Sequence, residues 1–472
     1  MYLKHFLPSA FTAAALFGAG SAGAVEIETG MDFLQDPQTE IEGLHRFYLG
    51  AEVGQDLTFG QAIYSAAAGD AGGAFFWGFE GVKRVPLNPS LSLSFSGFAG
   101  GGGGAGEVIG DGTMLRAGAA LDYQVSRDWA VQAGVSRIRI EGAEINDWAA
   151  GFGLAYRPDG AGTGQPGTPL RFRSVSFTGT VLRFPDGLTR AGNPQPDLKL
   201  VGVEGSFFAG ETAEVFVAAS GAASGGDGYM QVFGGYRLRH DLGPVSVYGQ
   251  AKLGFAGGGE VDTGAGPVTG AAAGVAVPLG RGIDLELAYE LIYVPDTGMT
   301  GSGVQARLTR VFHRSRSAPA SAEPQEWQLT MGFSAVDPNG TYMKSLSNDG
   351  ISPVMQESSI DLFLTDSLYL TGTAQTAFTG GVAGYAVGLL GLGYEFDLGG
   401  KWRIAVEGQL GAAGGGGVNV GKGLVGGARA ELDYRLTERG ALSLGAGWVK
   451  SIDGGVDAPV LQLGYKHRFF SS

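Results

Sequence analysis

The sequence predicts an all-β protein, a transmembrane antiparallel up-and-down β-barrel built from three repeats of about eight strands each. Three observations predict it: long segments that alternate apolar and polar residues, a repeat every 157 residues, and an export signal at the N-terminus. A soluble β-sandwich would alternate too, but its strands average about five or six residues. The segments here run to roughly twice that length, which favours strands that cross a membrane.

The alternation is clearest in residues 283–293. The odd-numbered positions hold Ile, Leu or Tyr, whereas Asp284, Glu286 and Glu290 occupy even-numbered positions. A period of two belongs to a β-strand and does not fit a helix. In lipid, only a closed barrel satisfies the backbone hydrogen bonds of such strands.

Glycine-rich runs recur at a fixed interval. Gly97, Gly254 and Gly411 begin similar runs that are 157 residues apart, and a Leu-Asp-Tyr sequence occurs at 121–123 and 432–434. Such self-similarity is the signature of a repeated structural unit. It divides the chain into a signal segment 1–24, repeats at 25–158, 172–312 and 326–472, and linkers at 159–171 and 313–325 that are rich in Pro, Gly, Ser or charge.

One strand departs from the interval of 157 residues. Leu91 and Phe95 belong to an apolar face, but 157 residues later the same face holds Tyr248 and Lys252. A bulge or a one-residue shift near the glycine run would restore the register. The residues alone do not choose between these two alternatives.

The N-terminus has the three parts of a cleaved export signal. Lys4 is basic, residues 6–17 are apolar, and Ala22 and Ala24 supply the small residues of a cleavage site. The chain contains no cysteine, which excludes a lipid anchor of the lipoprotein type and a disulfide framework. We therefore expect an exported protein.

The last strand ends in a polar residue, a glycine and then aromatic or apolar residues. Its key positions are Gly464, Tyr465, Phe469 and Phe470, and it resembles the terminal signal of Gram-negative outer-membrane β-barrel proteins, a generic porin-like class. Two terminal serines and a histidine at 467 depart from that pattern. The resemblance implies a location in the bacterial outer membrane, contact with its lipid, and recognition by the barrel-assembly machinery.

Two closures of the three repeats are possible. About 24 strands could form one wide barrel with a large lumen, or each repeat could close into an eight-stranded barrel filled by its own side chains. The long linkers and the small inward residues favour three barrels, whereas duplication of strands within one barrel is a natural route to a large pore. We favour one continuous barrel and keep tandem barrels as the alternative.

Charged residues on the inward face are the candidates for function. A lipid-facing arginine would cost about 2–4 kcal/mol at the midplane, so these residues should face the lumen. They are Arg116, Asp122, Glu286, Glu290, Arg429, Glu431, Asp433 and Arg435. In a wide barrel they would tune ion selectivity, and in a narrow one they would pair and hold the interior together.

Candidate catalytic groups are sparse. His45, which stands near an expected outer loop, is the one histidine that we consider for a hydrolase, and we interpret it as a solvated loop residue. No pair of histidines has metal-ligand spacing, and the glycine runs lack the Lys-Ser/Thr ending of a phosphate loop. The sequence therefore predicts a non-enzymatic protein with no catalytic residue, cofactor or metal site.

The net charge of −14 makes nucleic acid an unsuitable partner, because an acidic protein repels phosphate backbones. The sequence thus predicts a pore for passive or weakly selective passage of small solutes. The alternative is a structural or interaction protein whose small closed barrels present loops to a surface partner or an exported polysaccharide.

Overall fold

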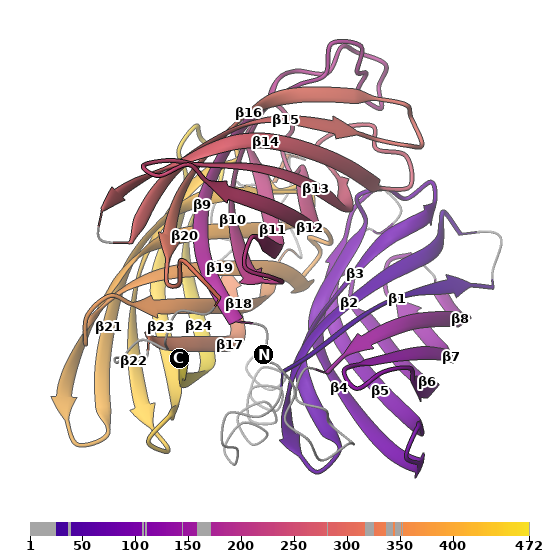
Figure 1. Ribbon diagram of the computed structural model, residues 1–472, viewed down its shortest axis with the longest axis horizontal. Helices are drawn as coiled ribbons and strands as arrows, with labels where there is room; N and C mark the ends of the chain where they lie inside the picture. The colour runs from indigo at the N-terminus through magenta and orange to yellow at the C-terminus, as the bar shows by residue number, and fades with distance from the viewer. Residues whose placement is uncertain are drawn as a thin grey trace.

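The computed structural model describes residues 25–35, 39–105, 108, 111–143, 145–157, 171–280, 282–316, 325–336, 343–344, 351 and 353–471. The export signal with Ala22 and Ala24 lies outside this range, as does most of each linker. Within the described residues the chain forms 24 strands, and they close into three separate barrels of eight. Figure 1 shows the barrels as a triangle, with the first at the right, the second at the top and the third at the lower left. In the part of the chain described, no helix is long and apolar enough to span a membrane.

All neighbouring strands within a barrel are antiparallel. Barrel 1 consists of β1(Val25–Leu34), β2(Ile41–Gly54), β3(Leu57–Gly69), β4(Phe75–Asn88), β5(Leu91–Gly103), β6(Met114–Gln124), β7(Trp129–Ile140) and β8(Ile145–Tyr156). Barrel 2 consists of β9(Arg171–Arg183), β10(Leu198–Phe208), β11(Ala213–Ser224), β12(Met230–Asp241), β13(Ser246–Gly257), β14(Pro267–Gly280), β15(Ile283–Tyr293) and β16(Thr300–Val311). Barrel 3 consists of β17(Gln325–Val336), β18(Val354–Phe363), β19(Leu368–Thr379), β20(Ala386–Gly399), β21(Trp402–Gly414), β22(Leu424–Arg435), β23(Gly440–Ser451) and β24(Asp457–Ser471). Arg171 and Gln325, which we assigned to the linkers, are the first residues of strands.

Each barrel closes between its own first and last strands. β1 pairs with β8, β9 with β16, and β17 with β24. Because both edges of every repeat are consumed in this way, no edge is left to pair with the next repeat. The expectation of one continuous barrel of 24 strands is therefore wrong, and the tandem alternative describes the fold.

The connections differ between the two ends of each barrel. At one end, here called the turn end, consecutive strands of a barrel are joined by two to four residues. At the other end, the loop end, the connections have four to 17 residues. Asp56 in the two-residue turn between β2 and β3 has a φ of 53°, the left-handed conformation that tight hairpins require.

The register misfit in the fifth strand has a structural cause. Gly103, Gly257 and Gly414 occupy equivalent positions, since each pairs with the first residue of the preceding strand. The interval is thus 154 residues from barrel 1 to barrel 2 and 157 from barrel 2 to barrel 3. A shift of three residues exchanges the two faces of a strand, so Phe95 is exposed on the outer wall while Tyr248 is buried inside. The proposed bulge or one-residue shift is replaced by this three-residue offset.

Candidate functional site in the barrel interiors

The middle of barrel 2 is filled by arginines and carboxylates in direct contact. Arg307 is 1% exposed and lies 2.8 Å from Glu204 and 2.7 Å from Glu286. Arg237 lies 2.6 Å from Glu204 and 3.2 Å from Glu214, which continues the network across the lumen. The alternation of strands β10, β11, β12, β15 and β16 projects these side chains to one interior, where opposite charges neutralise one another.

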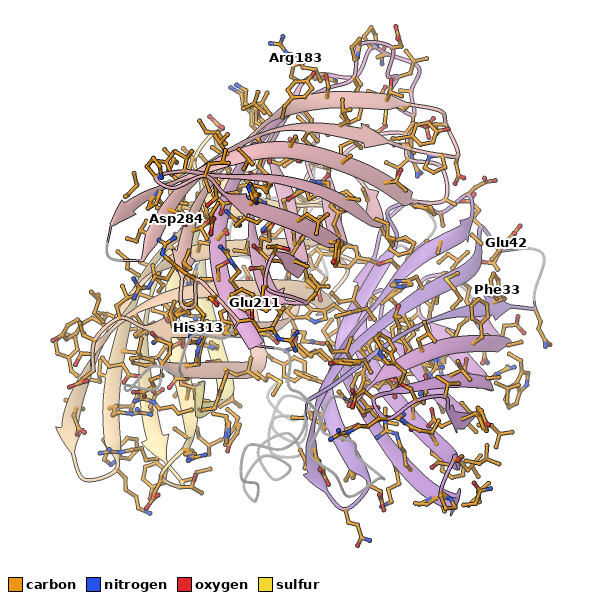
Figure 2. The ribbon with its side chains drawn as sticks, viewed as in Figure 1. Phe33, Glu42, Arg183, Glu211, Asp284 and His313 are labelled. Atoms are coloured by element: carbon orange, nitrogen blue, oxygen red, sulfur yellow. The ribbon has the colours of Figure 1, made fainter. Side chains whose placement is uncertain are left out.

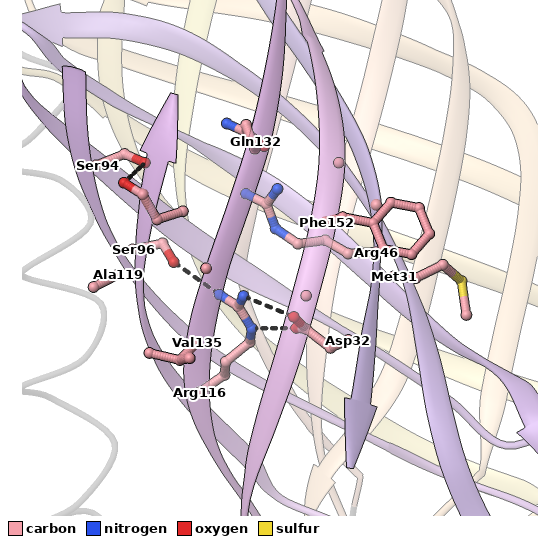
Figure 3. A pocket seen from close by; sticks show the side chains of 15 residues that line it. Met31, Asp32, Arg46, Ser94, Ser96, Arg116, Ala119, Gln132, Val135 and Phe152 are labelled. Carbon is pink, nitrogen blue, oxygen red and sulfur yellow. Dashed lines mark hydrogen bonds and ion pairs between the residues drawn. The ribbon is translucent and has the colours of Figure 1, made fainter. Parts of the chain in front are cut away.

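Barrel 1 holds a similar network with different residues. Arg46 bridges Glu28 at 2.7 Å and Glu80 at 2.9 Å. Arg116 contacts Asp32 at 2.6 Å and donates a hydrogen bond to Ser96 at 2.7 Å, as Figure 3 shows. These contacts join β1, β2, β4, β5 and β6 across the interior.

In barrel 3 a single arginine is surrounded by three carboxylates. Arg429 lies 2.6 Å from Glu407, 3.1 Å from Glu431, and in direct contact with Glu357. Lys466 lies 2.6 Å from Glu431. Charge is therefore balanced locally by residues that belong to the same repeat.

The structure places the predicted lumen charges as follows. Asp122, Glu286, Glu290, Glu431 and Asp433 are buried, and Arg116 and Arg429 lie among carboxylates within their barrels. Arg435 differs, because its side chain is one-third exposed at the turn end and pairs with the exposed Asp397 at 3.2 Å. The residues that the sequence analysis missed are mainly the partners, such as Arg307 and Glu204, which only the closure of each barrel brings together.

The loop end of each barrel is closed by apolar side chains. In barrel 1 Leu44, Phe76 and Ile138 form a buried cluster there. The loop that follows the fifth strand adds a fully buried valine in each barrel: Val108, Val261 and Val420. The glycine-rich runs thus lead into loops that turn inward, a role that the sequence did not reveal.

Small cavities lie inside barrels 1 and 3. A cavity of about 50 Å³ in barrel 1 lies between Asp32, Arg46 and Arg116 (Figure 3). Another of about 40 Å³ in barrel 3 lies beside Arg429 and Gln462. A cavity of this size has room for only a few water molecules.

The outer walls are apolar. On β15, Leu285, Leu287, Tyr289 and Leu291 are exposed, whereas Asp284, which Figure 2 labels, points inward and is buried. Aromatic pairs stand at the turn end, with ring centroids 4.8 Å apart for Trp129 and Tyr156 and for Trp402 and Tyr434. An apolar band bordered by aromatic residues is typical of barrels that face lipid.

His45 lies in strand β2 and not in a solvated loop, so that expectation is wrong. Its Nε2 is 2.8 Å from Thr29 Oγ1. Its ring stacks on Phe255 of barrel 2, with centroids 4.5 Å apart. These contacts give the residue a packing position between two barrels. Among the described residues, no group of three His, Cys, Asp or Glu side chains could hold a metal ion.

The predicted assembly signal forms the closing strand of barrel 3. Gly464 pairs with Gly332, and Phe469 pairs with Trp327, on whose ring it stacks at 6.4 Å between centroids. Tyr465 is buried, and the backbone of Phe470 pairs with Glu326. Recognition of this strand by the assembly machinery stays a prediction.

Comparisons with known proteins give structural likenesses alone. No protein-family model matches the sequence, and no curated protein matches it. The ferric enterobactin receptor of Pseudomonas aeruginosa is 12% identical over 96% of this chain and 82% of its own, with a TM-score of 0.31. Pseudomonas aeruginosa OccK2 in complex with glucuronate is 11% identical over 95% and 96%, with a TM-score of 0.25. A de novo designed transmembrane β-barrel is 11% identical over 31% of this chain and 98% of its own, with a TM-score of 0.23. Likenesses with TM-scores this low do not assign a family, a substrate or a partner to this chain.

Proposed function

We propose that the chain is a non-enzymatic protein of the Gram-negative outer membrane whose three barrels are closed to solutes and which acts as a structural or interaction protein. The observation that carries this proposal is the filling of the barrel interiors. In each barrel a network of buried ion pairs occupies the lumen, and apolar side chains close its loop end.

A solute could pass through a barrel only if the side chains that fill its lumen moved aside. Breaking a buried ion pair leaves a charge without its partner, which costs about 3–5 kcal/mol. In barrel 2 the path past Arg307 would require separation from both Glu204 and Glu286. The geometry therefore supports the closed alternative better than the pore.

The outer-membrane location rests on separate observations. The exposed apolar band with aromatic residues at the turn end suits contact with lipid. The export signal and the resemblance of the terminal strand to outer-membrane signals support the same location. In such a protein the loop end, which carries the longest connections, is the surface best suited to meet a partner outside the membrane.

Planar-bilayer recording of the purified full chain tests the closed state. We expect no steady single-channel conductance, because ion pairs and apolar side chains fill the lumen of each barrel. Insertion is verified by protease protection in vesicles and by the shift in gel mobility on heating. Reproducible conductance steps from inserted protein would contradict the closed state and return the pore as the function.

A further inference from the structure

The three barrels contact one another in a cyclic order. The fifth strand of each barrel meets the third strand of a neighbour: β5 meets β19, β21 meets β11, and β13 meets β3. The contacts therefore run from barrel 1 to barrel 3, from barrel 3 to barrel 2, and from barrel 2 back to barrel 1. A head-to-tail contact whose rotation closes in this way generates a ring, and Figure 1 shows the three barrels meeting near the centre of the view.

A glycine stands at each contact, which we call a seam. A Cβ added at Gly101 would lie 2.0 Å from the carbonyl oxygen of Ala377 in barrel 3. One added at Gly257 would lie 2.3 Å from Cα of Gly73 in barrel 1.

The third seam repeats this arrangement, since a Cβ at Gly414 would lie 2.2 Å from the backbone nitrogen of Gly228 in barrel 2. The atoms met at all three seams are backbone atoms of the neighbouring barrel. None of the three glycines has a positive φ. Glycine is therefore needed here for close approach, as at the contacts of membrane-spanning elements.

Polar contacts fix the seam between barrels 1 and 3. The backbone N–H of Gly384 donates to the carbonyl oxygen of Gly102 at 2.8 Å. Asp111 Oδ1 accepts hydrogen bonds from the N–H groups of Gly380 at 2.8 Å and Gly381 at 2.9 Å. The amide of Gln61, in the middle of β3, also contacts the hydroxyl of Ser358, in the middle of β18.

The other two seams carry polar contacts as well. Arg190 of barrel 2 donates to the carbonyl oxygen of Gly72 in barrel 1 at 2.7 Å. Lys344 of barrel 3 lies 4.0 Å from Asp227 of barrel 2. Barrels 2 and 3 further share an aromatic contact at the turn end, where the rings of Phe172 and Trp327 are 5.4 Å apart.

We propose that the protein is a fused trimer in which these seams, and not the linkers, hold the barrels together. At each seam, the fifth strand of one barrel packs against the third strand of the next barrel in the ring. Since every fifth strand and every third strand is already engaged, the ring is complete within one chain. The seams would hold the barrels together whether or not the lumen conducts.

Cutting the linkers of the folded full chain tests the proposal. Protease sites are placed within 159–170 and 317–324, the protein is folded in detergent or vesicles, and both linkers are cut. An affinity tag on barrel 3 is expected to recover all three barrels after cleavage. Separation of the barrels once the linkers are cut would overturn the proposal.

Leucine substitutions test whether the seam glycines are needed to hold the barrels together. Opening one seam leaves the ring joined through the other two, so both seams of barrel 1 must be opened by Gly101→Leu with Gly257→Leu. After cleavage we expect the tag on barrel 3 to recover barrel 2 and to lose barrel 1.

The matched control is Gly97→Leu with Gly249→Leu, on the same two strands. A Cβ at either control position meets no atom within 4 Å, so barrel 1 should be retained. Retention of barrel 1 in the seam variant, or equal loss of it in the control, would contradict the role of the glycines.

Cross-linking tests the seam between barrels 1 and 3 without placing a leucine in it. The chain has no cysteine of its own, so Gln61→Cys and Ser358→Cys introduce a single pair across the seam between barrels 1 and 3. A short thiol cross-linker is expected to join these two fragments after both linkers are cut. Failure to cross-link, with both thiols shown to be reactive, would contradict the seam.

Discussion

The substitution Arg429→Met is expected to lower the free energy of unfolding by about 3–5 kcal/mol, because it leaves buried carboxylates without their cation. Arg429 contacts Glu357, Glu407 and Glu431, and Glu357 is fully buried. Methionine keeps much of the apolar stem but supplies no charge. Urea unfolding in lipid vesicles, followed by tryptophan fluorescence and gel mobility, measures the loss.

Two further variants show whether the lost charge is responsible. Arg435→Met removes a partly exposed arginine of the same strand, and a surface pair such as Arg435 with Asp397 is worth about 0–1 kcal/mol. Adding Glu357→Gln to Arg429→Met should recover part of the stability, since it removes one unpaired charge, and a coupling above about 0.5 kcal/mol is expected for contacting residues. Equal losses for the two arginines would contradict a buried network.

The strands could be predicted from the sequence because each depends on local alternation. The alternating segment identified at 283–293 is β15. Antiparallel strands, eight in each repeat, are confirmed. These features follow from which face of each strand carries apolar side chains.

Whether the repeats close separately or together could not be predicted from the alternation of residues. The pattern of β17 is the same whether its free edge pairs with β16 or with β24, and the structure pairs it with β24. One signal was present in the sequence: inward charges can balance within a repeat. Arg429, Lys466 and their carboxylate partners all belong to the third repeat, which suits a narrow, self-contained interior.

The seams could not be predicted from the sequence for a different reason. The sequence shows that the glycine runs recur, and Gly103 is the last residue of β5. What each run contacts is set by residues far away in the chain, as with Gly101 and Ala377. The repeat interval held part of the answer, since Leu121 and Leu432 are 311 residues apart, three fewer than two steps of 157.

The substitution Leu287→Arg is expected to lower the free energy of unfolding in vesicles by about 2–4 kcal/mol, because its side chain would face the middle of the lipid layer. Leu287 lies in the middle of β15 and is 47% exposed. In water an exposed leucine replaced by arginine changes stability by no more than about 0.5 kcal/mol. The measurement therefore reports on the medium around the barrel.

A matched control removes the effect of charge itself. Leu279 is also exposed, at 60%, but stands one residue before the turn-end terminus of β14. At that depth an arginine reaches the interface, so Leu279→Arg should cost about 0–1 kcal/mol. A clear difference between the two leucines requires a depth-dependent environment, which only a membrane provides. Equal costs for the two variants would instead mean that water surrounds the apolar walls, and the outer-membrane location would then be wrong.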